Sequence, residues 1–297
     1  MKARIVIYAV IVSLLSSCNN QIKEIEKTSN NLLLAEKVQA KYFFSLTDTS
    51  YSKEWQESFD KDYLFKNTFN QIINNNFKVY DPNGSFSDTA DLVEKEEVMR
   101  NLGWDSISND YSELYEILFL EEWNVDTNLK SFIKIVKKWC PIRSWYIGGD
   151  KDRFAKKKVV YILPEENKRG KLICKDVYSS DILEPYSRHP IYTGLDKIKF
   201  IESVFKKIEK KEIIVYDPIH IIDKSQKPYS VEDIEKNIGY SINSRELIES
   251  ISSFLFIEDW YFDKESLCIY KEVKSMAFVQ WRREEQIEKI LFFIKFE

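Results

Sequence analysis

The chain contains an internal duplication, which constrains its fold more than any other feature of the sequence. A four-residue motif recurs 136 positions later, and an acidic-aromatic motif recurs at an offset of 137. The first motif is Val79, Tyr80, Asp81 and Pro82, repeated as Val215, Tyr216, Asp217 and Pro218. The second contains Glu121, Glu122, Trp123 and Asp126, repeated as Glu258, Asp259, Trp260 and Asp263; Lys134 then falls on Lys271. Because the matches keep their order at a nearly constant offset, we expect two similar structural units.

Both copies show the same predicted order of helices. Apolar residues at helical spacing predict one helix over 58–76 and another over 194–211. Each is followed by a short extended segment that ends at Asp-Pro, since proline disfavours helical geometry in the residue before it. A second helix follows in each copy. Ser230 begins the one in copy two as a capping box, and Gly103 and Gly239 are placed to end these helices with a positive φ.

The acidic-aromatic motif of each copy begins a predicted β-hairpin, and one more strand follows it. Side chains alternate along a strand, so we expect Ile133, Ile135, Lys137 and Trp139 to share one face of the first hairpin. The predicted strands are 119–126, 131–139 and 159–163 in copy one, and 256–263, 267–276 and 291–296 in copy two.

These elements together predict an α+β fold, a tandem duplication of a unit in which two or three helices are followed by a small antiparallel sheet. The chain would then have five parts. They are a signal segment (1–17), a tether with a first helix (18–50), unit 1 (51–165), a linker (166–193) and unit 2 (194–297).

The N-terminus has the features of a bacterial lipoprotein signal. Lys2 and Arg4 precede an apolar run over 5–15, which is shorter than the about 20 residues that a membrane-spanning helix needs. The run leads to Leu-Ser-Ser-Cys at 15–18, which resembles the bacterial lipobox, whose cysteine is lipidated and becomes the new N-terminus. We therefore expect cleavage before Cys18 and a lipid anchor on it; an ordinary signal peptide cleaved nearby is the alternative.

Composition argues against several classes of function. Loss of Lys2 and Arg4 changes the net charge from −4 to −6, and the charges are spread along the chain rather than gathered in a basic stripe for nucleic acid. The two histidines, His189 and His220, have no second ligand at metal spacing, and no Gly-rich phosphate loop occurs. We therefore expect no nucleic-acid partner, no metal and no cofactor.

Three cysteines remain after Cys18, and an odd number cannot pair completely. They are Cys140, Cys174 and Cys268. A disulfide between Cys140 and Cys174 is compatible with an oxidising periplasm, and so are buried free thiols.

The paired acids of the repeated motif are the residues that an enzyme could use for general acid–base chemistry. They are Glu121 with Glu122, and Glu258 with Asp259. Neighbouring residues on a strand point to opposite faces, so we expect one acid of each pair to be solvated. The other could pair across the hairpin with Lys134, Lys137 or Lys271. Because no nucleophile or metal set accompanies the acids, the sequence predicts a protein that is not an enzyme.

Aromatic residues supply the remaining candidates. Trp123 and Trp260 are expected in the core, because each recurs at the same point of the repeat. The aspartates of the two Asp-Pro motifs are expected to bond nearby backbone amides. Trp139, Trp145, Tyr146 and Trp281 are expected near the ends of the second hairpin strands. This set would be a protein-binding patch if exposed and core if buried.

The succession helix, Val-Tyr-Asp-Pro, helix, Glu-Glu-Trp-x-x-Asp, strand and Cys-Pro resembles the GldN/PorN family, periplasmic proteins of the type IX secretion and gliding-motility machinery of the Bacteroidetes. The resemblance covers roughly 58–165 and 194–297, with Pro141 at the exit of copy one. It implies a non-catalytic part of a periplasmic ring assembly that works with a lipoprotein partner. The sequence departs from the family because it carries the unit twice, has its own predicted anchor, and has Phe278 where Pro141 would fall.

The sequence thus predicts a non-catalytic, lipid-anchored scaffold or adaptor with protein partners from a secretion or motility complex. The stretch 19–23 has no acidic cluster of the kind that resembles surface-export tags in these bacteria, so we expect anchoring through acyl chains on Cys18 at the periplasmic face of the outer membrane. The alternative is a periplasmic lipoprotein that binds a small molecule or glycan, with the aromatic residues on a pocket wall.

Overall fold

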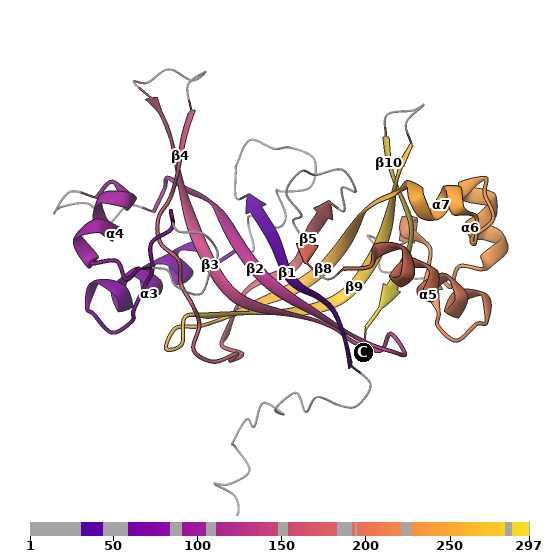
Figure 1. Ribbon diagram of the computed structural model, residues 1–297, viewed down its shortest axis with the longest axis horizontal. Helices are drawn as coiled ribbons and strands as arrows, with labels where there is room; N and C mark the ends of the chain where they lie inside the picture. The colour runs from indigo at the N-terminus through magenta and orange to yellow at the C-terminus, as the bar shows by residue number, and fades with distance from the viewer. Residues whose placement is uncertain are drawn as a thin grey trace, which may run out of the picture.

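The computed structural model describes residues 31–43, 59–83, 91–104, 111–147, 154–182, 192–193, 195–220, 227–282 and 287–296. Within these ranges ten strands form one antiparallel sheet, and the helices lie at its two ends (Figure 1). The central path of the sheet has the order β5-β8-β9-β3-β2-β1-β6, with β4, β7 and β10 attached beside it. Strands β1–β4 belong to the first half of the chain and β5–β10 to the second half.

The bounds of the elements follow the chain. The strands are β1 (Asn31–Phe43), β2 (Leu114–Asp126), β3 (Phe132–Tyr146), β4 (Phe154–Lys158), β5 (Lys171–Ile182), β6 (Tyr192–Thr193), β7 (Val215–Tyr216), β8 (Ile251–Asp263), β9 (Cys268–Arg282) and β10 (Ile287–Lys295). The helices are α3 (Lys61–Ile73), α4 (Lys95–Leu102), α5 (Lys197–Glu209), α6 (Val231–Ile238) and α7 (Arg245–Ser250), with a 3-10 turn η3 (Pro218–His220).

The expected fold, two units of helices each followed by a small sheet, is wrong. The hairpins β2–β3 and β8–β9 form as predicted, but they join each other in one sheet. The junction is the antiparallel pair of β3 with β9, in which Ile133 lies opposite Glu272 and Lys134 opposite Lys271. The two sheets merge because the second strand of each hairpin offers its free backbone edge to the other.

Each half also begins with a long strand that the sequence did not predict. β1 occupies the segment expected to be a tether and first helix, and β5 occupies the expected linker. β1 pairs along β2, and β5 pairs along β8, so each covers the outer edge of a hairpin. The strand predicted at 159–163 is instead β4 at 154–158, followed by single bridges at Tyr161 and Ile162.

The helices predicted at 58–76 and 194–211 are confirmed as α3 and α5, and corresponding aspartates begin them. Asp60 accepts from the backbone N of Tyr63 at 3.1 Å, and Asp196 from that of Lys199 at 3.0 Å. The capping box at Ser230 is also confirmed. A capping box is a local feature, which explains why the sequence pattern predicts the one at Ser230.

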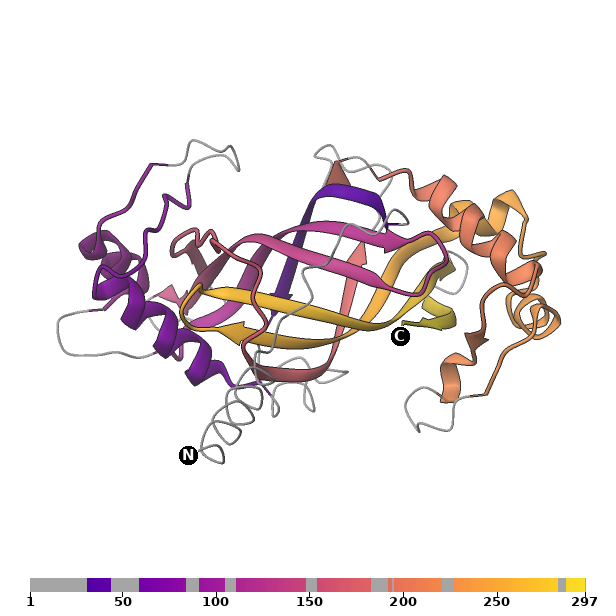
Figure 2. The ribbon, with the colours of Figure 1, turned by 90° about the horizontal axis from the view of Figure 1, so that it is seen from below.

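The helix α3 packs against the hairpin of the other half as well as its own. One core joins Phe65 and Phe69 of α3 to Phe262 and Leu267 of the second half. The side-chain amide of Gln71 also donates to the backbone O of Lys264 in the β8–β9 turn, at 3.3 Å. Figure 2 shows this turn on the side of α3 and the β2–β3 turn on the side of α5. The hairpins therefore cross the molecule and complete each other's cores.

The second core also combines a helix of one half with the hairpin of the other half. Phe200, Val204 and Phe205 of α5 lie in one cluster with Leu129 and Phe132 from the β2–β3 hairpin. The two halves are thus related by an approximate two-fold arrangement, which Figure 1 shows as matching left and right ends.

Glycines end α4 and α6 in the left-handed conformation, as predicted. The φ angles are 72° at Gly103 and 82° at Gly239. A Cβ at Gly239 would meet no atom within 4 Å, whereas a Cβ at Gly103 would overlap the guanidinium of Arg143. That guanidinium pairs with Glu113, so displacing it also disturbs an ion pair.

We predict that Gly239→Ala lowers the free energy of unfolding by about 1 kcal/mol, the cost of left-handed geometry in a residue with a Cβ. Gly103→Ala carries the same strain and moves Arg143, so we expect about 2 kcal/mol. Urea unfolding of the two variants measures the difference. Equal midpoints would show that Arg143 moves aside without cost.

Candidate functional site

The repeated acids and lysines of the two halves meet at the centre of the sheet. Glu121 of β2 pairs with Lys271 of β9, and Lys134 of β3 pairs with Glu258 of β8, where Nζ lies 2.7 Å from Oε1. All four side chains have no exposed surface. We call these four residues the central ion pairs. Each pair joins one half of the chain to the other.

The repeated tryptophans complete the central ion pairs. The indole Nε1 of Trp123 donates to Glu121 at 2.9 Å, and that of Trp260 donates to Glu258 at 2.8 Å. These contacts follow from strand geometry, because residues two apart lie on the same face. The motif Glu-x-Trp therefore places a buried carboxylate beside the donor that it needs. Trp123 and Trp260 lie in the core, as the sequence predicts.

Aromatic rings surround both buried ammonium groups. Lys134 Nζ lies 3.4 Å from the ring centroid of Phe256 and 4.8 Å from that of Trp123. Lys271 Nζ lies 3.6 Å from the Phe119 centroid and 4.1 Å from that of Tyr42. Cations over aromatic faces gain electrostatic stabilisation, most of all where water is excluded. The rings thus offset part of the cost of removing the lysines from water.

The electrostatics keep Glu121 ionised. Burial raises the pKa of its carboxyl, but Lys271 and Lys134 together lower it, and the net pKa lies below the usual value. Burial also lowers the pKa of Lys271, which the charges of Glu121 and Glu258 oppose. We infer that Glu121 and Lys271 face each other as charged groups.

This arrangement gives the inner acids a structural role. The sequence predicts that one acid of each pair bonds a lysine across the hairpin, and Glu121 and Glu258 each pair with a lysine. The two ion pairs join the halves of the chain, because Lys271 belongs to the second half and Lys134 to the first. A general acid or base must reach a substrate, and these carboxylates have no exposed surface.

The second acid of each motif lies on the opposite face of the sheet, which we call the outer face. Both hairpins have a register shift next to the motif, which places Lys137 on β3 and Lys274 on β9 at a β-bulge. Glu122 pairs with Lys137 at 3.0 Å within its own hairpin, and its side chain is 27% exposed. Asp259 lies 3.8 Å from Lys274 and is buried, so the expectation of one solvated acid in each pair is wrong for the second motif.

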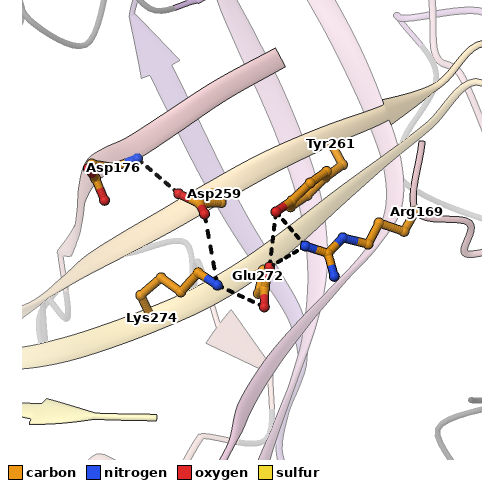
Figure 3. Close-up of polar contacts among 6 residues, drawn as sticks. All are labelled: Arg169, Asp176, Asp259, Tyr261, Glu272 and Lys274. Carbon is orange, nitrogen blue, oxygen red and sulfur yellow. Dashed lines mark hydrogen bonds and ion pairs between the residues drawn. The ribbon is translucent and has the colours of Figure 1, made fainter. Parts of the chain in front are cut away.

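A polar cluster surrounds Asp259 on the outer face (Figure 3). The backbone N of Asp176, which has a φ of 53° in β5, donates to Asp259 at 3.1 Å. Lys274 bridges Asp259 and Glu272, with 2.8 Å between Lys274 Nζ and Glu272 Oε1. Asp259 thus stabilises a strained backbone position where β5 passes the β8–β9 hairpin.

Arg169 and Tyr261 extend this cluster. The guanidinium of Arg169 lies 4.0 Å from the Tyr261 ring centroid and donates to Glu272 at 2.8 Å, and the Tyr261 hydroxyl also donates to Glu272, at 3.2 Å. Burial raises the pKa of Glu272. The charges and hydrogen bonds of Lys274 and Arg169 lower it by a larger amount, so the net pKa lies below the usual value. The first half has Asn124 and Ile135 where the second has Tyr261 and Glu272. The cluster is therefore a property of the second half alone.

The aspartates of the repeated motifs hold turns. Asp81 accepts from the backbone N of Asn83 at 2.8 Å and Asp217 from that of Ile219 at 2.9 Å, which confirms the predicted role of the Asp-Pro motifs. Asp126 and Asp263 act likewise at the hairpin turns. Asp126 accepts from the backbone N of Asn128 at 2.8 Å, and Asp263 from that of Ser266 at 3.0 Å. Pro82 and Pro218 follow these aspartates in short turns.

Tyr80 and Tyr216 also occupy equivalent places. Tyr80 forms bridges to Leu92 and Tyr161, while Tyr216 pairs with Phe293 of β10. Pro141 lies within β3 and its carbonyl accepts from the backbone N of Val159 at 2.9 Å. Tyr80, Tyr216 and Pro141 are therefore part of the hydrogen-bonded framework of the sheet.

The aromatic residues expected near the ends of the hairpin strands do not gather into one patch. Trp139 is fully buried, and its Nε1 donates to the backbone O of Leu267 at 2.9 Å. Trp145 is half-buried and Tyr146 exposed at the end of β3, whereas the exposed Trp281 lies near the end of β9. These two strand ends lie at opposite ends of the molecule (Figure 1).

The three cysteines after Cys18 lie among the described residues. Cys140, Cys174 and Cys268 are all buried and free, so the Cys140–Cys174 disulfide does not form. Burial raises the pKa of the Cys140 thiol to about 12 and that of Cys268 to about 11. Both thiols are therefore protonated at neutral pH, which makes them poor nucleophiles.

The described residues show neither a metal-binding cluster nor a membrane-spanning helix. The described residues contain no group of three or more His, Cys, Asp or Glu that could hold a metal ion. No helix among them is long and apolar enough to cross a membrane. Cys18 and the signal segment lie outside the described residues.

No protein-family model matches the chain, and no curated protein matches it.

Sequence reasoning did not identify Arg169, Tyr261 and Glu272 as candidates. Arg169 and Glu272 lie outside the repeated motifs, and Tyr261 lies inside one but replaces Asn124 of the first copy. Sequence reasoning also missed that Lys134 and Lys271 exchange partners between the halves. One signal could have revealed the exchange. Both lysines recur at the same offset as Glu121 and Glu258, and a buried charge that recurs needs a partner that recurs.

Proposed function

We propose that the protein is a non-catalytic scaffold or adaptor, held on a membrane by acyl chains on Cys18. The observation that carries the non-catalytic part is the burial of the motif acids. Glu121 and Glu258 have no exposed side-chain surface, and each is paired with a lysine of the other half. The repeated motifs thus serve to join the two halves rather than to supply reactive groups.

The anchoring part of the proposal rests on the sequence at 15–18, which resembles a lipobox. Two or more acyl chains on one cysteine give stable anchoring, whereas a single chain gives marginal binding. In the sequence, residues 19–30 lie between Cys18 and the first strand of the sheet, β1.

The test of the anchor is Cys18→Ser in the full chain. We expect the wild-type chain to incorporate a labelled fatty acid and to stay with membranes after a high-salt wash. The Cys18→Ser variant should incorporate no label and leave the membrane in that wash. Cys174→Ser is the matched control, because it removes a buried thiol and should change neither result. Labelling of Cys18→Ser at the wild-type level would contradict the proposal.

The resemblance to the GldN/PorN family supplies the partner to test. We propose that the protein binds components of a type IX secretion or gliding-motility complex. Affinity capture of the lipidated chain from gently solubilised membranes, followed by mass spectrometry, should recover ring components in stoichiometric amounts. A clean preparation that contains none of them would count against this assembly while leaving the anchor result unaffected.

A further inference from the structure

Two hairpin arms rise from the same side of the sheet at its opposite ends (Figure 1). The first arm is the end of β3 with β4, in which Arg143 lies opposite Lys157 and Trp145 opposite Ala155. The second arm is the end of β9 with the start of β10, in which Trp281 lies opposite Glu288. Because the halves are related by an approximate two-fold arrangement, one flat surface could contact both arms at once.

Large apolar side chains are exposed on both arms. Tyr146 is 53% exposed and Ile147 is 40% exposed at the end of the first arm. On the second arm Trp281 is 42% exposed and Ile287 is 47% exposed. Tryptophan and tyrosine favour the boundary between water and hydrocarbon, since each combines an apolar ring with a polar group.

The first arm is also rich in basic residues. Its described residues, 143–147 and 154–158, contain four basic residues and no acidic one, in a chain whose net charge is −4. Lys157 is exposed, and the guanidinium of Arg143 lies 4.4 Å from the ring centroid of Trp145. Lys156 pairs with Glu116 and retains an exposed fraction of 44%. Basic and aromatic side chains thus occur side by side on this arm.

From these contacts we infer that the two arms rest on an anionic lipid surface. The first arm supplies electrostatic attraction to acidic head groups, and exposed apolar side chains of both arms enter the interface. A flat and negatively charged surface matches both the common direction of the arms and the positive charge of the first. The inference goes beyond the proposed function, because it requires no acyl chain on Cys18.

The test uses a chain that begins at residue 19, which keeps every described residue and lacks Cys18. Binding to vesicles is measured by co-sedimentation, with vesicles of phosphatidylcholine alone or mixed equally with phosphatidylglycerol. We expect binding to the anionic vesicles that weakens as salt is added, and little binding to phosphatidylcholine. Lys157→Gln should weaken binding roughly fivefold, the effect of removing one charge near the surface.

Two further variants separate the arms from the rest of the protein. Trp281→Ala with Ile287→Ala should remove most of the binding, and should also remove a shift of tryptophan emission to shorter wavelength on adding vesicles. Lys130→Gln is the matched control for charge. Lys130 lies exposed in the β2–β3 turn, on the other side of the sheet from the arms, so its loss should leave binding unchanged.

Several results would overturn the inference. A folded wild-type chain that does not sediment with anionic vesicles would do so, and so would equal losses from Lys130→Gln and Lys157→Gln. A third result would combine two observations: the wild type binds no vesicles, and the arm variants lose a protein partner. The arms would then be a binding surface for that protein. None of these outcomes depends on whether Cys18 is lipidated, so the result stands apart from the test of the anchor.

Discussion

Lys271→Met is expected to lower the free energy of unfolding by about 3–5 kcal/mol, the usual cost of removing one partner from a buried ion pair. The substitution leaves the fully buried carboxylate of Glu121 without its closest cation. The thermodynamic penalty arises mainly from that unpaired charge, since methionine fills a volume similar to that of the lysine stem. Lys134→Met should behave alike, because it leaves Glu258 in the equivalent position.

Urea unfolding measures this effect, and two variants control it. Lys137→Met removes an exposed lysine that pairs with Glu122 on the same sheet, and should cost less than about 1 kcal/mol. The double variant Glu121→Leu with Lys271→Met removes both charges and should regain much of the lost stability. A loss from Lys271→Met no larger than that from Lys137→Met would show that the central ion pairs contribute little.

Trp139→Ala should lower the free energy of unfolding by a similar amount, about 3–5 kcal/mol, because it empties a large volume in the core. Trp139 is fully buried on β3, and its indole donates to the carbonyl of Leu267 in the other half. Trp139→Phe keeps most of the packing but leaves that carbonyl without this donor, so we expect a loss of about 1–3 kcal/mol.

Thermal and urea unfolding of both Trp139 variants provide the measurement. Trp145→Ala is the matched control, since Trp145 lies on the same strand but is only half-buried. It should cost clearly less than Trp139→Ala. Equal losses at the two positions would contradict the assignment of Trp139 to the junction between the halves.

The parts of the fold that the sequence predicts correctly are those with local causes. The capping box at Ser230, the left-handed glycines that end α4 and α6, and the two hairpins all depend on residues a few positions apart. The pairing of β3 with β9 joins residues such as Lys134 and Lys271, far apart in the chain. No local pattern encodes that choice, so the single sheet could not be predicted.

The sequence did not predict β1 as a strand, because β-bulges interrupt its alternation. Register shifts interrupt β1 between Leu33 and Val38, and they break the alternation by which strands are recognised. Leu34, Val38 and Tyr42 are buried at intervals of four residues, which is helical spacing. A helix was expected in this segment, where the structure has a strand that pairs with β2 and β6.

A bulge also explains the error at Trp139. Strict alternation places Trp139 on the same face as Ile133 and Ile135. The register shift at Lys137 moves the rest of β3 by one position, so Trp139 points into the core while the two isoleucines lie on the outer face. A single extra residue reverses the faces of all residues after it.

For the candidate site, the sequence identified the right residues and the wrong environment. Glu121, Glu258 and the two tryptophans were singled out because they recur. Their burial depends on the other half of the chain, whose lysines and aromatic rings enclose them. Paired acids on an isolated strand would be solvated, and only the tertiary fold removes them from water.

The crossing of the hairpins has a consequence for how the chain acquires its structure during synthesis. The first half is complete in sequence well before Lys271 and Leu267 are made, yet Glu121 and Trp139 need those residues as partners. Before the second half is made, the charged carboxylate of Glu121 has to remain hydrated, and one edge of β3 lacks its partner strand β9. Contacts of such long sequence separation form slowly, and an open strand edge can pair with the wrong chain. Folding of the first half therefore has to await the second, and the interval between them is when this protein is most exposed to aggregation.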